Sequence, residues 1–394
     1  MPVDLDALPE KLLPPDPPRL ARWVFVVLLC ALLGGALAFL FWPGERWRLS
    51  AWFWSCVLIL PAVSGLMLFA LRQLAYEKNR DYADSWNASQ EKYEQLLIQQ
   101  GQQAVAILAS AYCSPTGSTQ IAQTLRNGSR PLQALDHQEL AFDGQPLDKT
   151  EQPNWKARCE ARLRADLQQL LAGITPDLQR CADDAALQVR IRHNAVFGND
   201  EIEALWRSCR GDQTLADQLT FASEDDGLLW LDAWLDSPLP ARPILSVQFD
   251  ALLMPVAGQA ESASAVLLAP AQWSAEKDLP ALALVHRPVQ VSEAKTAIQR
   301  ALLWGQVPPT SNDFHIWHSQ LSSEFLAEVS VDLHALERSP DGAHWSSMDG
   351  FGVPKCAVGN MALVVASEQA KAERRAQLVL LRDSCVQACV IQPV

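Results

Sequence analysis

The chain has 394 residues, of which 49% are hydrophobic and 20% charged, and this composition excludes wholesale disorder. The formal net charge is −13 and no long run of lysine or arginine occurs. We therefore expect no nucleic-acid partner, because phosphate neutralisation dominates that affinity. Nine cysteines, an odd and scattered set, indicate a reducing compartment rather than a disulfide framework.

Two uncharged runs follow a short proline-rich tail. The tail, residues 1–21, is expected to be extended, because proline fixes φ and removes a hydrogen-bond donor. Residues 24–42 and 51–71 carry no charge, and each run has about the length that a helix needs to cross ~30 Å of hydrocarbon. We predict a transmembrane helical hairpin over residues 22–72, in contact with the lipid bilayer through residues 24–71.

Basic residues flank the outer sides of this hairpin. Three of them precede the first run and three follow the second within ten residues, whereas the connecting loop holds only Arg46 and Arg48. The positive-inside rule then places both termini and the large domain in the cytoplasm. Because the second run follows so closely, a retained two-pass anchor is favoured over a cleaved signal peptide.

A polar helix is predicted to leave the membrane within a linker of residues 73–112. Residues 76–111 begin with a strongly charged, solvated stretch, and Gly101 is expected to kink or interrupt the helix. Its apolar positions come late, so its far end should dock on the domain that follows. These late positions are Leu96, Leu97, Val105, Ile107 and Leu108.

Residues 113–394 are predicted to form a soluble α/β domain, either as one body or as two lobes that divide near residue 240. Residues 114–154 look loop-rich. Helical spacing predicts helices at 155–182, 199–209, 292–304 and 359–374. The expected strands are residues 187–193, 244–249, 264–269, 281–286, 328–333, 377–382 and 387–392. Strands that alternate with helices indicate the α/β class.

No motif predicts a catalytic, cofactor or metal site. The chain lacks G-x-x-x-x-G-K-[ST], G-x-G-x-x-G after a strand, and H-E-x-x-H. His315 and His318 have helical ligand spacing but no obvious third ligand, so polar residues beside a core are favoured. Ser292 and Lys295 have the spacing of Ser–Lys acyl enzymes without the companion motifs, and a helix N-cap is the plainer role for Ser292. Cys385 and Cys389, too far apart for a redox pair, are read as buried small hydrophobes.

An acidic stretch surrounds two tryptophans one helical turn apart, Trp230 and Trp234. Its carboxylates suggest either a solvated face or a hard-cation site, and no spacing of a known loop supports the second. Exposed tryptophans would instead form a partner surface, because aromatic residues anchor interfaces. We keep this surface as a hypothesis, with the carboxylates Asp232 and Asp236 beside the tryptophans. The stretch begins earlier, at Asp225 and Asp226.

The second half of the soluble region resembles the thiolase-type fold of β-ketoacyl synthases. Residues 259–269 (QAESASAVLLA) are similar to a small-residue strand of those enzymes, and residues 359–372 with two closing strands are similar to their final helix and hairpin. Condensing enzymes use a cysteine nucleophile with two histidines, or with a histidine and an asparagine. Here Pro354-Lys-Cys-Ala-Val-Gly359 stands where one catalytic histidine is expected, and it contains none. The resemblance therefore implies a catalytically inactive relative.

The overall plan resembles accessory inner-membrane proteins encoded with bacterial type VI secretion systems. It combines the hairpin with Trp86-Asn-Ala-Ser89 and residues 93–101 on the emerging helix, followed by the thiolase-like domain. This resemblance implies an adaptor at the bacterial inner (cytoplasmic) membrane that loads or presents effectors, with the secretion apparatus or an effector as protein partner.

We therefore expect a non-enzymatic, membrane-anchored adaptor. Two alternatives stay open: a thiolase-like enzyme that handles acyl groups or thioesters, and a membrane-anchored sensor or assembly subunit. The enzyme requires a nucleophile beside a base, so burial of Cys356 without a histidine would count against it. The adaptor requires an exposed apolar surface or an unpaired strand edge.

Overall fold

The computed structural model describes most of the chain, in two compact units, residues 4–97 and residues 98–394. Each unit is treated by itself. The described residues are 3–41, 50–114, 117–127, 155–182, 187–210, 218–222, 226–237, 242–252, 259, 261–338 and 345–394. The predicted loop region at 128–154, Asp225 and the predicted lobe boundary near residue 240 lie outside them.

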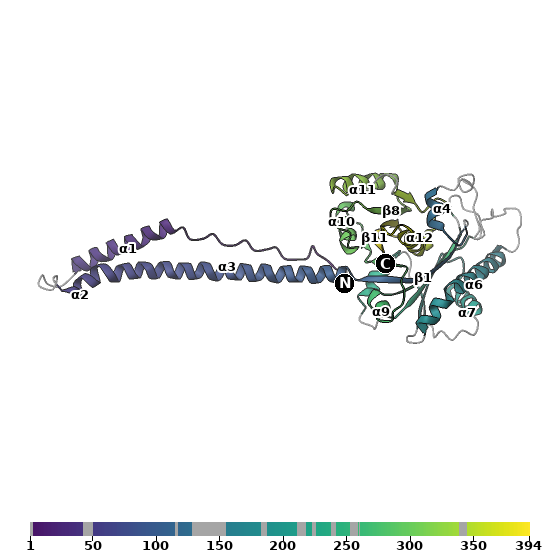
Figure 1. The fold of residues 1–394 in the computed structure, drawn as a ribbon, viewed down its shortest axis with the longest axis horizontal. Helices are drawn as coiled ribbons and strands as arrows, with labels where there is room; N and C mark the ends of the chain where they lie inside the picture. The colour runs from purple at the N-terminus through teal and green to yellow at the C-terminus, as the bar shows by residue number, and fades with distance from the viewer. Residues whose placement is uncertain are drawn as a thin grey trace. The chain divides into compact units, whose positions relative to one another are not determined.

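The first unit is built from helices (Figure 1). They are α1 (Leu20–Phe41), α2 (Ala51–Trp54), the π-helical η2 (Ser55–Ile59) and α3 (Leu60–Gly101). α1 packs closely on the second run because Gly34 and Gly35 carry no side chain. A Cβ at Gly34 would lie 2.5 Å from Pro61, and one at Gly35 would lie 2.9 Å from the carbonyl oxygen of Val57. Such small-residue contacts are typical of helices that pair in membranes.

α1 and the helical run from Ala51 are long and apolar enough to cross a membrane. Only 6% of the most apolar window of α1 is buried, and 17% of that of the second run, so neither is the core helix of a soluble protein. Their outward side chains include leucine, valine and phenylalanine, which are more stable in an apolar medium than in water. Residue 42 and the loop at 43–49 lie outside the described residues.

The predicted linker helix ends earlier than expected. α3 stops at Gly101, and β1 (Ala104–Cys113) follows, so residues 104–111 form a strand rather than the docked end of a helix. The sequence AVAILASAYC is a nearly continuous apolar run, which is typical of a strand that is buried on both faces. Gly101 is the last helical residue, and it has no room for a side chain because the ring of Trp304 occupies the space beside its Cα.

The second unit, residues 98–394, corresponds to the predicted soluble domain and is called the soluble unit from here on. It contains a mixed sheet made of two similar halves. The first half has the order β3-β2-β4-β5-β1 and the second has β9-β8-β10-β11-β6. Both halves read 3-2-4-5-1 when the strands are numbered in chain order within each half and the short β7, which lies off this path, is left out. In each half the fifth strand is antiparallel to its neighbours and the other pairs are parallel. β1 and β6 pair antiparallel and join the halves, with residue 104 opposite His286.

Each half of the sheet consists of five strands in this order, and β7 is an additional short strand. The first half contains β1 (Ala104–Cys113), β2 (Gln188–His193), β3 (Gln218–Phe221), β4 (Ile244–Asp250) and β5 (Ser262–Pro270). The second contains β6 (Ala283–His286), β8 (Phe314–Ser319), β9 (Trp345–Ser347), β10 (Ala376–Arg382) and β11 (Val386–Pro393), with β7 (Val289–Gln290) beside β11.

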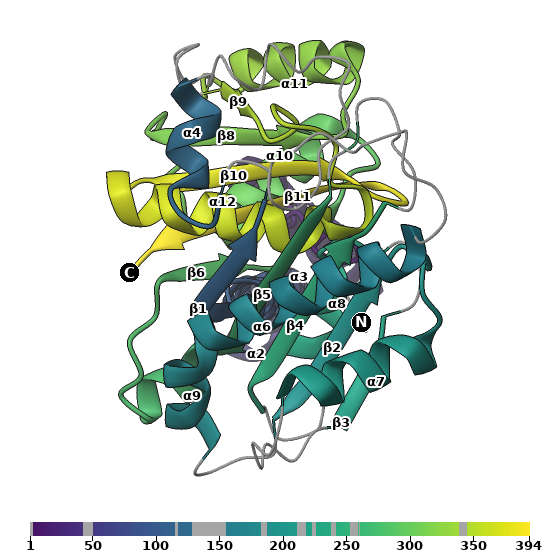
Figure 2. The same cartoon turned by 90° about the vertical axis from the view of Figure 1, so that its right-hand side faces the viewer.

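The helices form layers on both sides of each half (Figure 2). One outer core lies under α6 (Trp155–Ala182) and α7 (Asn199–Arg210), and another under α10 (Ala294–Trp304) and α11 (Ser323–Ala335). The middle core surrounds α12 (Val358–Glu373), most of whose residues are buried. Alternate residues of β1 and β5 enter the outer and middle cores, as the period of two requires. The shorter helices are α4 (Ile121–Asn127), α8 (Trp230–Leu235) and α9 (Ala271–Glu276).

Most of the other predicted elements are confirmed, and two further local assignments are wrong. The helices at 155–182 and 359–374 and the two closing strands appear with shifts of at most one residue. Residues 328–333, predicted as a strand, lie in α11, which Ser322 caps by accepting a hydrogen bond from the backbone N–H of Phe325. α10 begins at Ala294 after Glu293, so Ser292 is not its N-cap.

We predict that Gly101→Ala destabilises the soluble unit by roughly 1–3 kcal/mol, the usual cost of overpacking. The added Cβ would lie 2.3 Å from the ring of Trp304, a side chain that is only 2% exposed and has no room to move. Thermal unfolding of the detergent-solubilised chain measures the change. Gly198→Ala is the matched control, since its nearest neighbour would be 3.8 Å away. Equal melting temperatures for both variants would contradict the close approach.

Candidate functional site

Polar residues from both halves of the sheet gather at the ends of β2, β4 and β10 and at the start of α12. Asp250 is the last residue of β4, Arg192 lies near the end of β2, Asp383 follows β10, and Cys356 comes just before α12. We call these four residues the buried polar cluster. The carboxyl ends of parallel strands are the usual place for binding sites in α/β proteins, so this position is the first to examine.

The thiol of Cys356 has two acceptors. Its Sγ lies 3.3 Å from the carbonyl oxygen of Phe249 and 3.8 Å from Oδ1 of Asp250. Among the described residues no histidine contacts it. The group beside this thiol that is able to accept a proton is therefore a carboxylate.

A strained turn presents Cys356. The preceding residue, Lys355, has φ +39°, a conformation that side chains other than glycine rarely adopt. Gln320 holds this turn by donating a hydrogen bond from Nε2 to the carbonyl oxygen of Lys355 at 3.1 Å. Strained backbone of this kind persists only where the surroundings enforce it, and it concentrates at functional sites.

Burial sets the protonation states of the pair. It raises the pKa of Asp250 from 3.8 to about 7, while Lys355, Cys356 and Asn194 partly oppose the rise. Burial and the charge of Asp250 also raise the pKa of the Cys356 thiol well above its usual value, and Arg192 lowers it in part. At neutral pH the thiol is therefore protonated, and Asp250 is close to its titration midpoint.

Arg192 and Asp383 connect the halves beside this pair. Both side chains are almost fully buried, and the guanidinium contacts both carboxylate oxygens, one of them at 2.9 Å. Asp383 also accepts a hydrogen bond from the backbone N–H of Gly227 at 2.8 Å. Gly227 has φ +52°, and a side chain there would collide with Gln387, so glycine is required at this turn.

Several buried polar atoms around the cluster have no partner within the described part of the chain. They include Oδ2 of Asp250, Oδ1 of Asn194 and Nε2 of Gln248. Native proteins satisfy nearly all such atoms, and each exception requires an explanation, such as a ligand, an ion or a water. Gln248 and Asn360 are otherwise bonded to one another, with 2.9 Å from the backbone nitrogen of Asn360 to Oε1 of Gln248. The cluster thus offers both a donor and acceptors to a bound group.

The predicted partner surface has a role inside the molecule. Asp232 and Asp236 both contact the buried Arg287 at 2.6 Å, so these carboxylates are not simply solvated. Trp230 and Trp234 are half-buried, and Arg190 lies over the ring of Trp230, 4.4 Å from its centroid. Whether this face also binds a partner stays a prediction.

The remaining candidates lie apart from the cluster. His315 and His318 are on strand β8, where a spacing of three points side chains to opposite faces, and His315 contacts Ser346. Cys389 is buried in β11, and Cys385 lies in the turn before it. Within the described residues no group of three histidines, cysteines or carboxylates is placed to hold a metal ion.

Comparison with known proteins identifies the fold but no family. No family model and no curated protein matches the chain. A chain from a complex of a type II polyketide synthase acyl-carrier protein with its ketosynthase, bound to the hexaketide, resembles it with a TM-score of 0.52. That likeness has 11% identity and covers 74% of this chain and all of that one.

Two further structures resemble the chain with lower scores. An oxazolomycin ketosynthase domain of Streptomyces albus gives a TM-score of 0.49, at 11% identity, over 74% of this chain and 96% of that one. The peroxisomal thiolase of Saccharomyces cerevisiae gives 0.43, at 9% identity, over 74% and 98%. At sequence identities this low, a structural likeness shows the fold alone. The conclusion about the fold rests on the structure with a TM-score of 0.52. The soluble unit has a thiolase-like α/β fold, as the sequence resemblance implied.

These findings correct the expected function. The expected non-enzymatic adaptor for effector loading is contradicted, since the structure that the chain matches at a TM-score of 0.52 comes from a ketosynthase complex. Of the expectations, the alternative of a thiolase-like protein is the one that shares the fold shown by this match. No comparison supports the expected likeness to type VI secretion accessory proteins.

Sequence reasoning missed most of the cluster. It considered Cys356 but not Arg192, Asp250 or Asp383, because no motif links residues so far apart in the chain. A weak signal existed in that each charge interrupts or ends an apolar strand, as in LQVRIRH and ILSVQFD. A charge at such a place is costly unless it is paired or functional.

We predict that Asp250→Asn stabilises the chain increasingly as pH rises. The folded pKa of about 7 exceeds the ordinary 3.8, so proton binding by Asp250 contributes stability that is complete below about pH 4 and lost as pH rises through 7. The asparagine has no such loss. Its advantage over the native chain should grow by ~4 kcal/mol across that interval.

Thermal unfolding of both chains between pH 4.5 and pH 8.5 measures this change. The difference between the chains removes the contributions of His286 and His318, whose pKa values are lowered by burial. A difference that is independent of pH would contradict the raised pKa of Asp250.

We also predict that Arg287→Met destabilises the soluble unit by about 3–5 kcal/mol, because Asp232 and Asp236 would keep buried charges without their cation. Arg207→Met, which removes an exposed arginine from a pair on α7, should cost no more than about 1 kcal/mol. Denaturant unfolding compares them. Similar midpoints would show that the two carboxylates are solvated after all.

Proposed function

We propose that the soluble unit transfers or holds acyl groups from thioesters, with Cys356 as the acceptor and Asp250 as its base. The observation that carries this proposal is the contact of the Cys356 thiol with Asp250 at 3.8 Å, on a strained turn before the central helix of a thiolase-like fold. The unpartnered polar atoms beside it support a bound ligand.

The chemistry follows from the protonation states. As a thioester carbonyl carbon approaches, the thiol proton passes to Asp250 and Sγ forms the new bond to that carbon. The original carbon–sulfur bond then breaks, and the leaving thiolate takes the proton back from Asp250. The products are an acyl group on Cys356 and a free thiol. The nearby guanidinium of Arg192 stabilises the transient thiolate.

This proposal differs from ordinary condensing-enzyme chemistry because a carboxylate replaces the histidine. A carboxyl with a pKa of about 7 is suited to proton transfer near neutral pH, since catalysis is most efficient when the pKa of the base lies close to the working pH. In the described structure no histidine lies beside the thiol, and Asp250 is the base in its place.

We further propose that the two apolar helices anchor this unit as a two-pass protein in a bacterial inner membrane, with both termini and the soluble unit in the cytoplasm. Their length and exposed apolar side chains support the anchor, and the flanking basic residues support the orientation. The lipid bilayer is then the partner of residues 24–71.

We predict that a small soluble thioester, butyryl-N-acetylcysteamine, acylates Cys356 in the detergent-solubilised chain. Intact-mass and peptide mass spectrometry should locate one hydroxylamine-sensitive butyryl group. The rate should rise with pH through about 7 as Asp250 loses its proton, and Asp250→Asn should slow it at least tenfold and remove that inflection.

Matched variants decide the outcome. Cys356→Ala should abolish the adduct, whereas Cys385→Ala, which removes another half-buried thiol, should leave it intact. The melting temperature of each variant confirms that it is folded. An adduct that persists in Cys356→Ala, or a native chain that stays unmodified, would rule out this function.

A further inference from the structure

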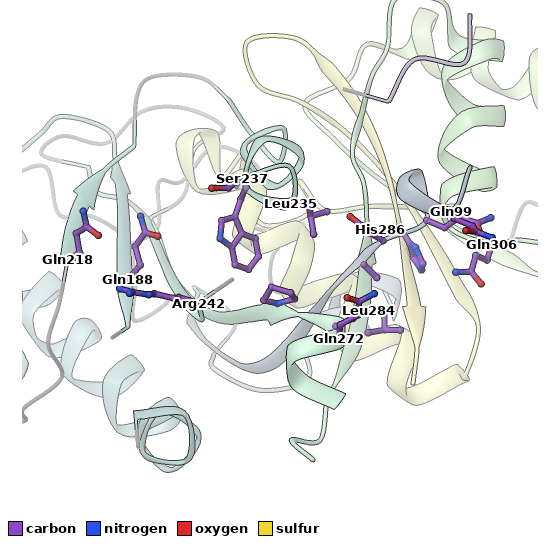
Figure 3. Close-up of a pocket in the computed structure, with 16 residues that line it drawn as sticks. Gln99, Gln188, Gln218, Leu235, Ser237, Arg242, Gln272, Leu284, His286 and Gln306 are labelled. Atoms are coloured by element: carbon purple, nitrogen blue, oxygen red, sulfur yellow. The ribbon is translucent and has the colours of Figure 1, made fainter. Parts of the chain in front are cut away.

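A second site lies at the other end of the strands. A cavity of about 790 Å³ opens at the amino ends of β2, β3 and β4, and Figure 3 shows the residues that line it. β4 has seven residues, so its two ends are separated by on the order of 20 Å. The cavity is therefore distinct from the buried polar cluster. Its volume is within the usual range for small-molecule pockets.

The walls combine apolar surface with side-chain amides. Trp234, Leu235, Leu284 and Pro270 supply the apolar part, and glutamines from five different segments surround it. In Figure 3, Gln188, Gln218 and Arg242 lie toward one end of the cavity, and Gln99 and Gln306 toward the other. An apolar wall edged by amides suits an amphiphilic molecule rather than a fully polar one.

The charge of the lining favours a negatively charged group on the ligand. Among the described residues that line the cavity there is no aspartate, glutamate or lysine, and Arg242 is their one permanent cation. Within the described part of the chain, Arg242 is exposed and forms no ion pair or hydrogen bond. A carboxylate at that end of the cavity would meet an unpaired guanidinium, the group best suited to bind it.

His286 gives an independent indication of a ligand. It lines the cavity and is only 3% exposed, and its Nδ1 has no hydrogen-bond partner within the described structure. Burial lowers the pKa of His286 to about 4, so the ring is neutral at physiological pH. A neutral ring adds no second positive charge, which limits the site to one anionic group.

From this lining we infer that the cavity binds a monoanionic acyl amphiphile, a medium-chain carboxylate whose chain lies against Trp234, Leu235 and Leu284 and whose carboxylate pairs with Arg242. Binding at this cavity does not require acyl transfer at Cys356, because none of the lining residues belongs to the buried polar cluster.

Photolabelling of the full chain in nanodiscs tests this site. The probe is an eight-carbon fatty acid that carries a diazirine, and labelled peptides are located by mass spectrometry. We expect labelling of residues 230–237 or 283–286 that saturates and is displaced by octanoate. Cys356→Ala should retain this labelling, which separates the result from any failure of acyl transfer.

Three variants refine the test. Leu284→Trp fills the cavity and should reduce labelling at least tenfold, whereas Val331→Trp, at a side chain 68% exposed on α11, should have no effect. Arg242→Gln should weaken displacement by octanoate about tenfold and leave displacement by octanol unchanged. If Leu284→Trp fails to fold, displacement from the native chain still decides.

Three results would overturn the inference. Labelling confined to residues 20–71 would show that the probe partitions only into the membrane around the apolar helices. Equal labelling in folded Leu284→Trp would show that the cavity is not the site. Displacement by octylamine as effective as that by octanoate would remove the carboxylate from the proposed ligand.

Discussion

The buried ion pair between Arg192 and Asp383 links the two halves of the soluble unit beside Cys356 and Asp250. Arg192 comes from the first half of the sheet and Asp383 from the second, and their side chains are 3% and 7% exposed. Asp383 also fixes the turn at Gly227 through a backbone hydrogen bond. Loss of one partner from such a pair leaves an uncompensated buried charge at a cost of about 3–5 kcal/mol.

The nearby cations act differently on the thiol and on the carboxyl of the cluster. Arg192, which Asp383 engages with both carboxylate oxygens, lowers the pKa of the Cys356 thiol in part, whereas Lys355 is the cation that partly opposes the rise in the pKa of Asp250. Burial then dominates, and its pKa rises to about 7. A fold shared with ketosynthases at 11% identity would not by itself give this result, since function depends on the residues of the site.

Local sequence pattern predicted the elements better than it predicted their arrangement. Leucine spacing in α6 and alanine content in α12 are local signals, and these helices were found within one residue of their bounds. β1 was missed because its apolar run directly follows a long polar helix, and periodicity does not separate a short buried strand from a buried helix turn. Residues 328–333 alternate like a strand, but the Ser322 cap and the packing of α11 override that pattern.

The site was hidden for a different reason. Arg192, Asp250, Cys356 and Asp383 come from four separate segments, and only the pairing of strands across both halves brings them together. The acidic tryptophan stretch, in contrast, was noticed because its residues are adjacent in sequence. Its role in packing depends on ion pairs with Arg287, which is distant in sequence and appears only in the structure. Proximity in sequence therefore drew attention to residues with a clear role in packing, while those best placed for chemistry were scattered.

The segment around α8 joins the two sites. At its start, the N–H of Gly227 bonds Asp383 and that of Leu228 bonds Gln387, which places it beside the buried polar cluster. At its end, Trp234 and Leu235 line the amide-edged cavity. Arg287 fixes this end through Asp236. Because backbone bonds hold one end and a buried ion pair holds the other, the short helix cannot shift toward one site without straining its contacts at the other. The two sites therefore share one wall, even though they lie at opposite ends of the strands.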